Sequence, residues 1–285
     1  MAIYLSRNVF ILPDLLAKWP WKRNINPHHL QAKTESSAWI QGIIASTPPV
    51  QRAFALGNFE LLASLAYPLE NKDVLRAGCD LMNLFWLLDE YTDIVAPHEV
   101  QQVAMIVMDA LRNPDKVRPS NECVVGEAAR QFWKLSLKCA SVGARRRFID
   151  TFEKYTASLI QQAQDRVQKY VRGIDEYLDV RRQTAGVEPS VVILQFGLDL
   201  PDEVFEDPVI QRLTDTCTDM IMLSNDLYSY NVEQARGDDG HNIVTIVMHQ
   251  EKIGLDEAMK WIDDYYSKLD SRVNLNATWM DWVTG

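Results

Sequence analysis

Three oxygen-bearing side chains recur at four-residue steps in the last third of the chain. Asn225, Ser229 and Glu233 would share one face of a helix, which would then offer an amide, a hydroxyl and a carboxylate. Such hard oxygen donors suit Mg²⁺, an ion that keeps some of its waters and commonly bridges to substrate phosphates. The spacing indicates a metal site. The alternative is a solvated face, because Asn and Ser are mediocre helix formers.

A second group of acids lies upstream. Asp89 and Asp93 are also four residues apart, with Glu90 on the neighbouring face. Alone, such a group is typical of a solvated surface. The apolar run from Leu84 to Leu88 comes directly before it, however, and an acid that ends a buried helix needs a cation to offset its desolvation.

The same order of residues occurs at both sites. Met220-Ile221-Met222-Leu223 leads into Asn225 with only Ser224 between, so an apolar run again precedes the oxygen ligands. Two clusters of this design are less expected by chance than one. Two helices that presented these faces to each other would form a metal-lined mouth.

The elements that must position these groups are predicted to be helices. Apolar residues recur at three- and four-residue steps in three stretches, Val74–Leu88, Ala128–Asp179 (with breaks near Gly143 and Gly173) and Val209–Val232. Val244–Val247 has the composition of a strand but fits better in a helix that runs to His249. We expect an all-α protein of about ten helices, folded as one domain over residues 1–285.

Composition excludes several classes of protein. The formal charge of −10 and the scattering of the 29 basic residues argue against a nucleic-acid partner, and an acidic protein that binds an anion needs metal ions. No apolar run is long enough to span a bilayer, and Val9–Leu12, cut by Pro13, is too short for a signal-peptide core. The four cysteines are far apart, and His28–His29 has no partner spacing for zinc. We expect a soluble, cytoplasmic protein without stable membrane insertion.

Together these residues resemble the two metal motifs of the class I terpene synthases, in particular the sesquiterpene synthases of mushroom-forming fungi. The aspartate-rich motif D-[DEN]-x-x-D is matched by Asp89, Glu90 and Asp93, and the motif N-D-x-x-S-x-x-x-E by Asn225, Asp226, Ser229 and Glu233. The likeness extends from Phe10–Leu15 to Trp279–Trp282 and so covers essentially the whole chain. It implies one helical bundle around a central active-site cavity.

The segment from Tyr177 to Gly186 resembles the family's diphosphate sensor. Arg181 is expected to be the sensor, because its fork can donate to two phosphate oxygens and keeps its charge. An Arg pair on a helix surface is the alternative. Thr184 and Ala185 follow where the family has a helix break that couples diphosphate binding to ionisation, and Arg182 is expected to support the helix.

The polar segment 234–242 resembles the family's lid over the metal cluster. Gly237 and Gly240 would give it the freedom that a lid needs. Arg236 either reaches the diphosphate or is solvated, and His241 is expected to be structural.

Two departures from the family pattern are visible. Val232 stands where many relatives have a Lys that contacts diphosphate, and the chain ends at Gly285 without the family's Arg-Tyr pair. We expect either a truncated C-terminal tail or closure with fewer donors.

The resemblance implies a linear prenyl diphosphate substrate and three Mg²⁺ ions, two of them on the upstream acids, mainly Asp89. Metals and Arg181 would neutralise the departing diphosphate. Phe85, one turn before Asp89, is the candidate wall for the carbocation. Trp279 or Trp282 would close the other side, and the alternative for either tryptophan is a core position.

Farnesyl diphosphate is the expected substrate, because the nearest relatives use it. The alternatives are a monoterpene synthase that uses geranyl diphosphate, an early quench to an acyclic alcohol of the linalool or nerolidol type, and a non-catalytic helical protein derived from a synthase. A chain-elongating prenyltransferase would carry a second aspartate-rich motif in place of Asn225–Glu233. A monomer or a homodimer is expected.

Overall fold

The computed structural model describes residues 10–44, 48–237 and 239–284, and for residues 48–51, 53 and 274–284 it describes the backbone alone. Every regular element within these residues is helical, which confirms the all-α prediction. There are thirteen α-helices in this part of the chain instead of about ten, because several short helices lie between the long ones. The single domain over residues 1–285 stays a prediction.

The chain divides into two compact units, each built from separate segments. The first comprises Met1–Pro20, Gln168–Arg182 and Gln211–Gly285, and the second comprises Trp21–Val167 and Gln183–Ile210. Helices α8 (Ile174–Thr184) and α11 (Pro208–Arg236) carry residues of both.

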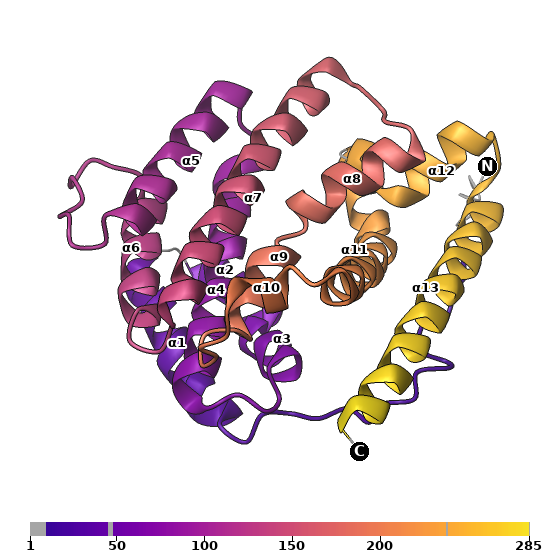
Figure 1. Cartoon of the computed structure of the whole chain (residues 1–285). Coiled ribbons are helices and arrows are strands. Elements are labelled where there is room, and N and C mark those ends of the chain that lie inside the picture. Colours follow the sequence, from indigo (N-terminus) through magenta and orange to yellow (C-terminus); the bar gives the residue numbers. More distant parts are fainter. Residues whose placement is uncertain (1–9, 45–47, 238, 285) are drawn as a thin grey trace. The chain divides into compact units, whose positions relative to one another are not determined.

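The second unit contains most of the helices (Figure 1). They are α1 (His29–Ile43), α2 (Pro48–Gly57), α3 (Phe59–Ala66), α4 (Lys72–Thr92), α5 (Pro97–Arg112), α6 (Val124–Ser136), α7 (Val142–Gln168), α9 (Val187–Ile193) and α10 (Asp202–Phe205). The breaks before α7 and after it lie close to the predicted positions at Gly143 and Gly173.

Helix α4 is the central element of this unit. It packs against α1, α3, α5, α6 and α9. Asn71 caps its N-terminal end. The side chain of Asn71 accepts hydrogen bonds from the backbone N–H groups of Asp73 and Val74 at 3.0 and 3.1 Å and so satisfies donors that have no partner within the helix. Its apolar residues are buried along its length, including Leu81, Leu84 and Leu88.

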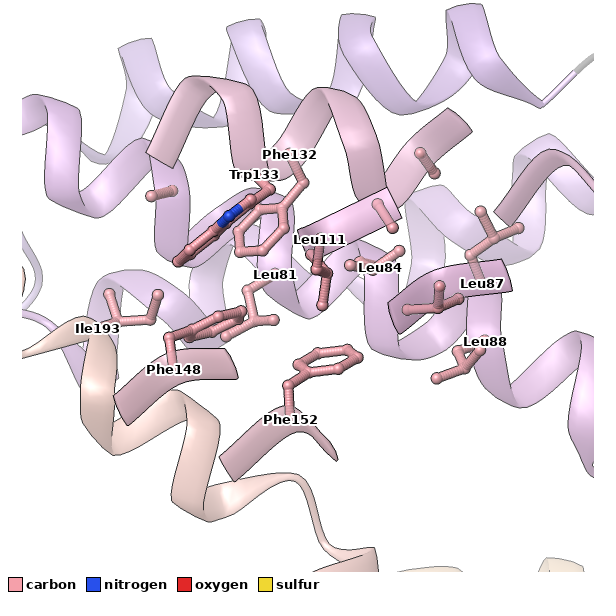
Figure 2. Packing of buried hydrophobic residues seen from close by; sticks show 14 of the residues in the cluster. Leu81, Leu84, Leu87, Leu88, Leu111, Phe132, Trp133, Phe148, Phe152 and Ile193 are labelled. Carbon is pink, nitrogen blue, oxygen red and sulfur yellow. The ribbon is translucent and has the colours of Figure 1, made fainter. Parts of the chain in front are cut away.

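Aromatic side chains fill the space between α6 and α7, as Figure 2 shows. The rings of Trp133 and Phe148 are stacked with centroids 4.8 Å apart, and Phe148 contacts Phe152 at 5.5 Å. Aromatic pairs at these separations contribute beyond the area that they bury. Leu81 and Leu84 of α4 lie in the same cluster, so this core holds the helix that carries the upstream acids.

A buried polar network fixes the first half of α4. Asp80 accepts hydrogen bonds from Ser36 of α1 at 2.5 Å and from Arg76 at 2.8 Å, and Asn83 donates to Ser36 at 3.0 Å and to Glu60 of α3 at 3.3 Å. Burial raises the pKa of Asp80 to about 6, against the effect of Arg76. The network joins three helices through groups that have partners, which is the condition under which polar groups are tolerated in a core.

The first unit contains the C-terminal helices. It includes α8 up to Arg182 and most of α11. A 3₁₀ turn (η1, Asp239–His241) then leads to α12 (Ile243–Glu251) and α13 (Leu255–Thr284). Helix α12 packs against η1 and α13. Residues 244–247 are helical, as predicted.

Replacing Phe148 by Ala is expected to destabilise the protein by about 3–5 kcal/mol, because the ring is fully buried among other rings and its loss leaves a cavity. Urea unfolding followed by circular dichroism measures the change. Leu69→Ala is the control, since this side chain is 88% exposed and its loss should change stability by less than about 0.5 kcal/mol. Equal unfolding midpoints for the two variants would contradict this account of the core.

Candidate active site

The upstream acids lie at the C-terminal end of α4. Asp89 is partly buried, whereas Glu90 and Asp93 are exposed. Asp89 lies on the last turn of the helix, and Asp93 caps its end, where its backbone N–H donates to the carbonyl of Asp89 at 2.9 Å. The predicted order holds here, because buried Leu87 and Leu88 directly precede Asp89.

Phe85, one turn before Asp89, belongs to an aromatic cluster with α7. Its ring stacks on Phe152 with an interplanar angle of 4° and centroids 5.9 Å apart, and Tyr155 meets it edge-on at 5.0 Å. Phe85 is partly buried, while Phe152 and Tyr155 are almost fully buried. The two buried rings fix the orientation of Phe85. A side chain that forms the wall of a pocket needs such a fixed orientation.

The helix break predicted after Arg181 is present. Helix α8 ends at Thr184, which is buried, and Gly186 caps the start of α9 in the left-handed conformation, with φ +67°. A Cβ atom at Gly186 would lie 3.1–3.3 Å from three carbons of the Phe85 ring. Both the backbone conformation and the close ring therefore require glycine. Ala185, beside it, is partly buried.

Arg181 of α8 and Asp226 of α11 form an ion pair in which the carboxylate is buried and the guanidinium partly buried. The Nε and Nη2 groups of Arg181 donate to Oδ1 of Asp226 at 3.0 and 2.9 Å, and Nη2 also donates to Oδ1 of Asn225 at 2.7 Å. Burial opposes the charge of the guanidinium, but Asp226 outweighs it, so the pKa of Arg181 lies above its ordinary value. The structure thus brings together the predicted sensor and the first predicted ligand of the downstream motif.

Asp226 is also held by two groups that sequence reasoning missed. Its Oδ2 atom accepts from the hydroxyl of Tyr177 and, at 3.0 Å, from the backbone N–H of Ile243. Burial, followed by the charge of Asp226, raises the pKa of Tyr177 well above its ordinary value, so the phenol keeps the proton that it donates. Tyr177 is one turn before Arg181, a spacing that could have identified it.

Asn242 is the second residue that was missed. It is fully buried, and its amide donates to the carbonyl of Asp226 at 2.8 Å and to Oε2 of Glu233 at 2.9 Å. Its Oδ1 atom accepts from the backbone N–H of Val244 and caps α12. This side chain therefore links the end of the loop to Glu233, the last residue of the downstream motif.

The three predicted downstream ligands fit a divalent cation. Asn225 is exposed, and Ser229 and Glu233 are partly buried on the same face of α11. Burial raises the pKa of Glu233, and a bound cation would reverse this effect. In the described part of the chain no three His, Cys, Asp or Glu side chains gather around one point.

The remaining predicted residues have other surroundings. Arg182 makes a two-pronged contact with Asp219 of α11, at 2.6 and 3.0 Å, and it also donates to Asp179 at 2.9 Å. It thereby joins α8 to α11, in keeping with a supporting role. Arg236 is exposed at the end of α11.

The segment predicted as a lid contains one residue, at position 238, that lies outside the described residues. Gly237 has φ +72°, and burial lowers the pKa of His241 to about 3, with Arg181 acting in the same direction. His241 is therefore neutral, as a structural residue would be. The side chains of Trp279 and Trp282 lie outside the described residues.

The aspartate-rich motif belongs to the second unit and the Asn225 motif to the first. The surroundings of each motif are therefore given only for its own unit. A cavity between α1, α4 and α6, of about 360 Å³, is lined by residues such as Trp39, Arg76 and Lys138, and no predicted site residue lines it. The central cavity stays a prediction.

Comparison with known proteins identifies the family. Residues 80–269 match the model of terpene synthase family 2, C-terminal metal binding. The Delta(6)-protoilludene synthase of Armillaria gallica is 51% identical over 268 residues, which cover 94% of this chain and 77% of that protein. The chain belongs to the terpene synthases. Sesquiterpene synthase 9 of Postia placenta is also similar, 49% identical over 90% of this chain and 75% of that protein.

Solved terpene synthases share the fold. The linalool/nerolidol synthase of Streptomyces clavuligerus superposes with a TM-score of 0.81 over 96% of this chain and 90% of that chain, at 16% identity. The resemblance to class I terpene synthases is confirmed, and the family is metal-binding. Among the described residues of this terpene synthase, the helices are too short or too polar to cross a bilayer.

The Asp226→Asn variant is expected to lose about 3 kcal/mol of stability, because the partly buried Arg181 guanidinium would keep its charge without a countercharge. Urea unfolding measures the loss. Asp179→Asn is the matched control, since Asp179 pairs with Arg182 at a side-chain exposure of 76% and should contribute less than about 1 kcal/mol. A similar loss in both variants would show that burial of the first pair is irrelevant.

Gly186→Ala is expected to cost about 1–2 kcal/mol, because alanine resists the left-handed conformation and its methyl group would press on Phe85. Thermal unfolding measures the effect. Gly197→Ala is the control, since a Cβ there meets nothing within 4 Å and the φ angle is not positive. Unchanged stability of the Gly186 variant would refute the proposed need for glycine.

Proposed function

We propose that this terpene synthase is a Mg²⁺-dependent sesquiterpene synthase, which ionises farnesyl diphosphate and releases a sesquiterpene hydrocarbon or alcohol together with diphosphate. The observation that carries the proposal is the hydrogen bonding of Arg181 to both Asn225 and Asp226. It places a permanent cation beside the motif that resembles a metal site. The similarity to the two fungal enzymes named above supports the substrate class.

In this proposal the oxygen ligands hold three ions. Asp89 and Asp93 would bind two of them, and Asn225, Ser229 and Glu233 would bind the third. When bound, Mg²⁺ neutralises the charge that develops on the diphosphate as the allylic carbon–oxygen bond breaks. No protein acid is needed, because the electron pair of that bond leaves with the diphosphate.

The chain's own residues would grip the leaving group and direct the cation. Arg181 is proposed to donate to diphosphate oxygens, and Arg236, at the end of α11, to assist it. Phe85 would present an aromatic surface to the carbocation, held by its stack on Phe152. Loss of a proton or addition of water would then end the reaction, in a site from which bulk water is otherwise excluded.

The setting of the reaction is part of the proposal. Cys79, Cys123, Cys139 and Cys217 are free thiols, which is the usual state in a reducing, cytoplasmic environment. We propose that the enzyme works there without nucleic acid or stable membrane insertion, as a monomer or a homodimer.

Incubation with Mg²⁺ and farnesyl diphosphate, followed by analysis of volatiles and released diphosphate, tests the proposal. Asp89→Ala and Asn225→Ala should each lower turnover by about a hundredfold or more at fixed Mg²⁺, because each removes a metal ligand. Asp73→Ala, on an exposed turn at the other end of α4, is the matched control and should retain activity.

Several results would contradict the proposal. Full activity in the Asp89 or Asn225 variant would refute the metal assignment, and turnover in excess chelator would refute the need for a divalent ion. If the enzyme forms products from geranyl diphosphate but not from farnesyl diphosphate, it is a monoterpene synthase. Release of diphosphate from neither substrate would indicate a non-catalytic protein.

A further inference from the structure

Arg166, near the end of α7, contacts the bend that follows the aspartate-rich motif. Its Nη2 atom donates to the carbonyl of Thr92 at 3.2 Å and to the carbonyl of Val95 at 2.9 Å. These two carbonyls lie on either side of Asp93 in the chain. The last carbonyls of a helix have no partner within it, so a donor from another element decides how that end is held.

The bend is short, and a second contact holds the end of it that leads into α5. Helix α4 ends at Thr92, and α5 begins at Pro97. The carboxylate of Glu99 accepts from the backbone N–H of Ala96 at 3.0 Å, which fixes the entry into α5. The contact of Arg166 with Thr92 and Val95 therefore closes the remaining stretch, the one that contains Asp93.

The charge and the support of Arg166 suit this task. A cation is favourable at the C-terminal end of a helix, where the helix dipole is negative. Here Asp89 and Glu90 lie on the last turn and Asp93 directly follows it, so the cation also offsets the mutual repulsion of these three acids. Helix α7 carries Phe152 and Tyr155 against Phe85, one turn before Asp89, so one rigid element contacts both sides of the motif.

We propose that Arg166 is a positioning residue for the aspartate-rich motif: it fixes the bend around Asp93, so that the carboxylates are oriented before Mg²⁺ binds. The inference rests on the proposed function, because it takes Asp89 and Asp93 as metal ligands. Residues that orient ligands without touching the ion commonly change metal affinity by a factor of about ten or more.

Helix α7 supplies a matched control. Arg145, near its other end, makes the same kind of contact with the end of α6, where Nε donates to the carbonyl of Ala140 at 2.9 Å and Nη2 to that of Leu137 at 2.7 Å. No predicted metal ligand lies on α6. Loss of either arginine removes one clamp on a helix end, but only the loss of Arg166 should affect the metal motif.

The experiment compares Arg166→Met, Arg166→Lys and Arg145→Met in the full chain. Arg166→Met should raise the Mg²⁺ concentration for half-maximal diphosphate release by about tenfold, with little change in kcat at saturating Mg²⁺. Arg166→Lys keeps the charge but lacks the fork, so it should recover part of the loss. Arg145→Met should leave the Mg²⁺ requirement unchanged.

Two measurements do not depend on turnover. Hydrogen exchange of the backbone amides from Asp89 to Val95 should become faster in Arg166→Met and stay unchanged in Arg145→Met. Titration of Mg²⁺ in the presence of inorganic diphosphate, followed by thermal shift, should need more Mg²⁺ in the Arg166 variants alone.

An Arg166→Met variant that only melts earlier, with the Mg²⁺ requirement of the wild type, would overturn the inference and leave a purely structural clamp. If that variant does not fold, the Mg²⁺ requirement and the hydrogen exchange of the Arg166→Lys variant test the inference instead. The proposed function fails separately: in that case the wild-type protein itself would show no Mg²⁺-dependent turnover, or Asp89→Ala would retain it.

Discussion

The ion pair between Arg181 and Asp226 is the interaction on which the first unit depends. Charges removed from water are costly unless their partners are well placed, and here the carboxylate is 2% exposed. Asp226 meets this condition with Arg181 and Tyr177 from α8 and the N–H of Ile243 at the start of α12. One carboxylate thus holds three elements in register. Asn225 and Ser229, the predicted ligands on either side of it in α11, lie on a helix that this contact holds in place.

The sequence predicted the parts of the site that depend on local spacing. Asn225, Ser229 and Glu233 share a face because a helix repeats every 3.6 residues, and the acids from Asp89 to Asp93 end an apolar helix as expected. The break after Thr184 was also predicted, from the family resemblance. These features are encoded within a few residues of each other, so no knowledge of tertiary contacts was needed.

The contacts that hold these groups could not be predicted in the same way. Tyr177 meets Asp226 across 49 residues of chain, and Arg166 meets Val95 across 71. The spacing of Tyr177 from Arg181 places it on the same face of the helix but does not show which group its hydroxyl meets, and nothing in the local pattern distinguishes Arg166 from a solvated arginine. The close approach of Gly186 to Phe85 likewise depends on how α9 packs against α4. The number of helices was underestimated because the shortest ones carry almost no periodic signal.

Asn242 gives the loop after α11 a property that matters for engineering. The hydrogen bond between its side chain and that of Glu233, nine positions earlier in the chain, closes the intervening backbone into a ring. The entropy of closing such a ring rises slowly with its length, by only about 0.6 kcal/mol for each doubling. Residues could therefore be added between Arg236 and Asp239 at small cost in folding free energy, provided that both ends of the ring are kept. Asp239 and His241 would have to stay, because Asp239 accepts a hydrogen bond from Thr245 and His241 packs against Tyr177, so only the first part of the loop can vary in length.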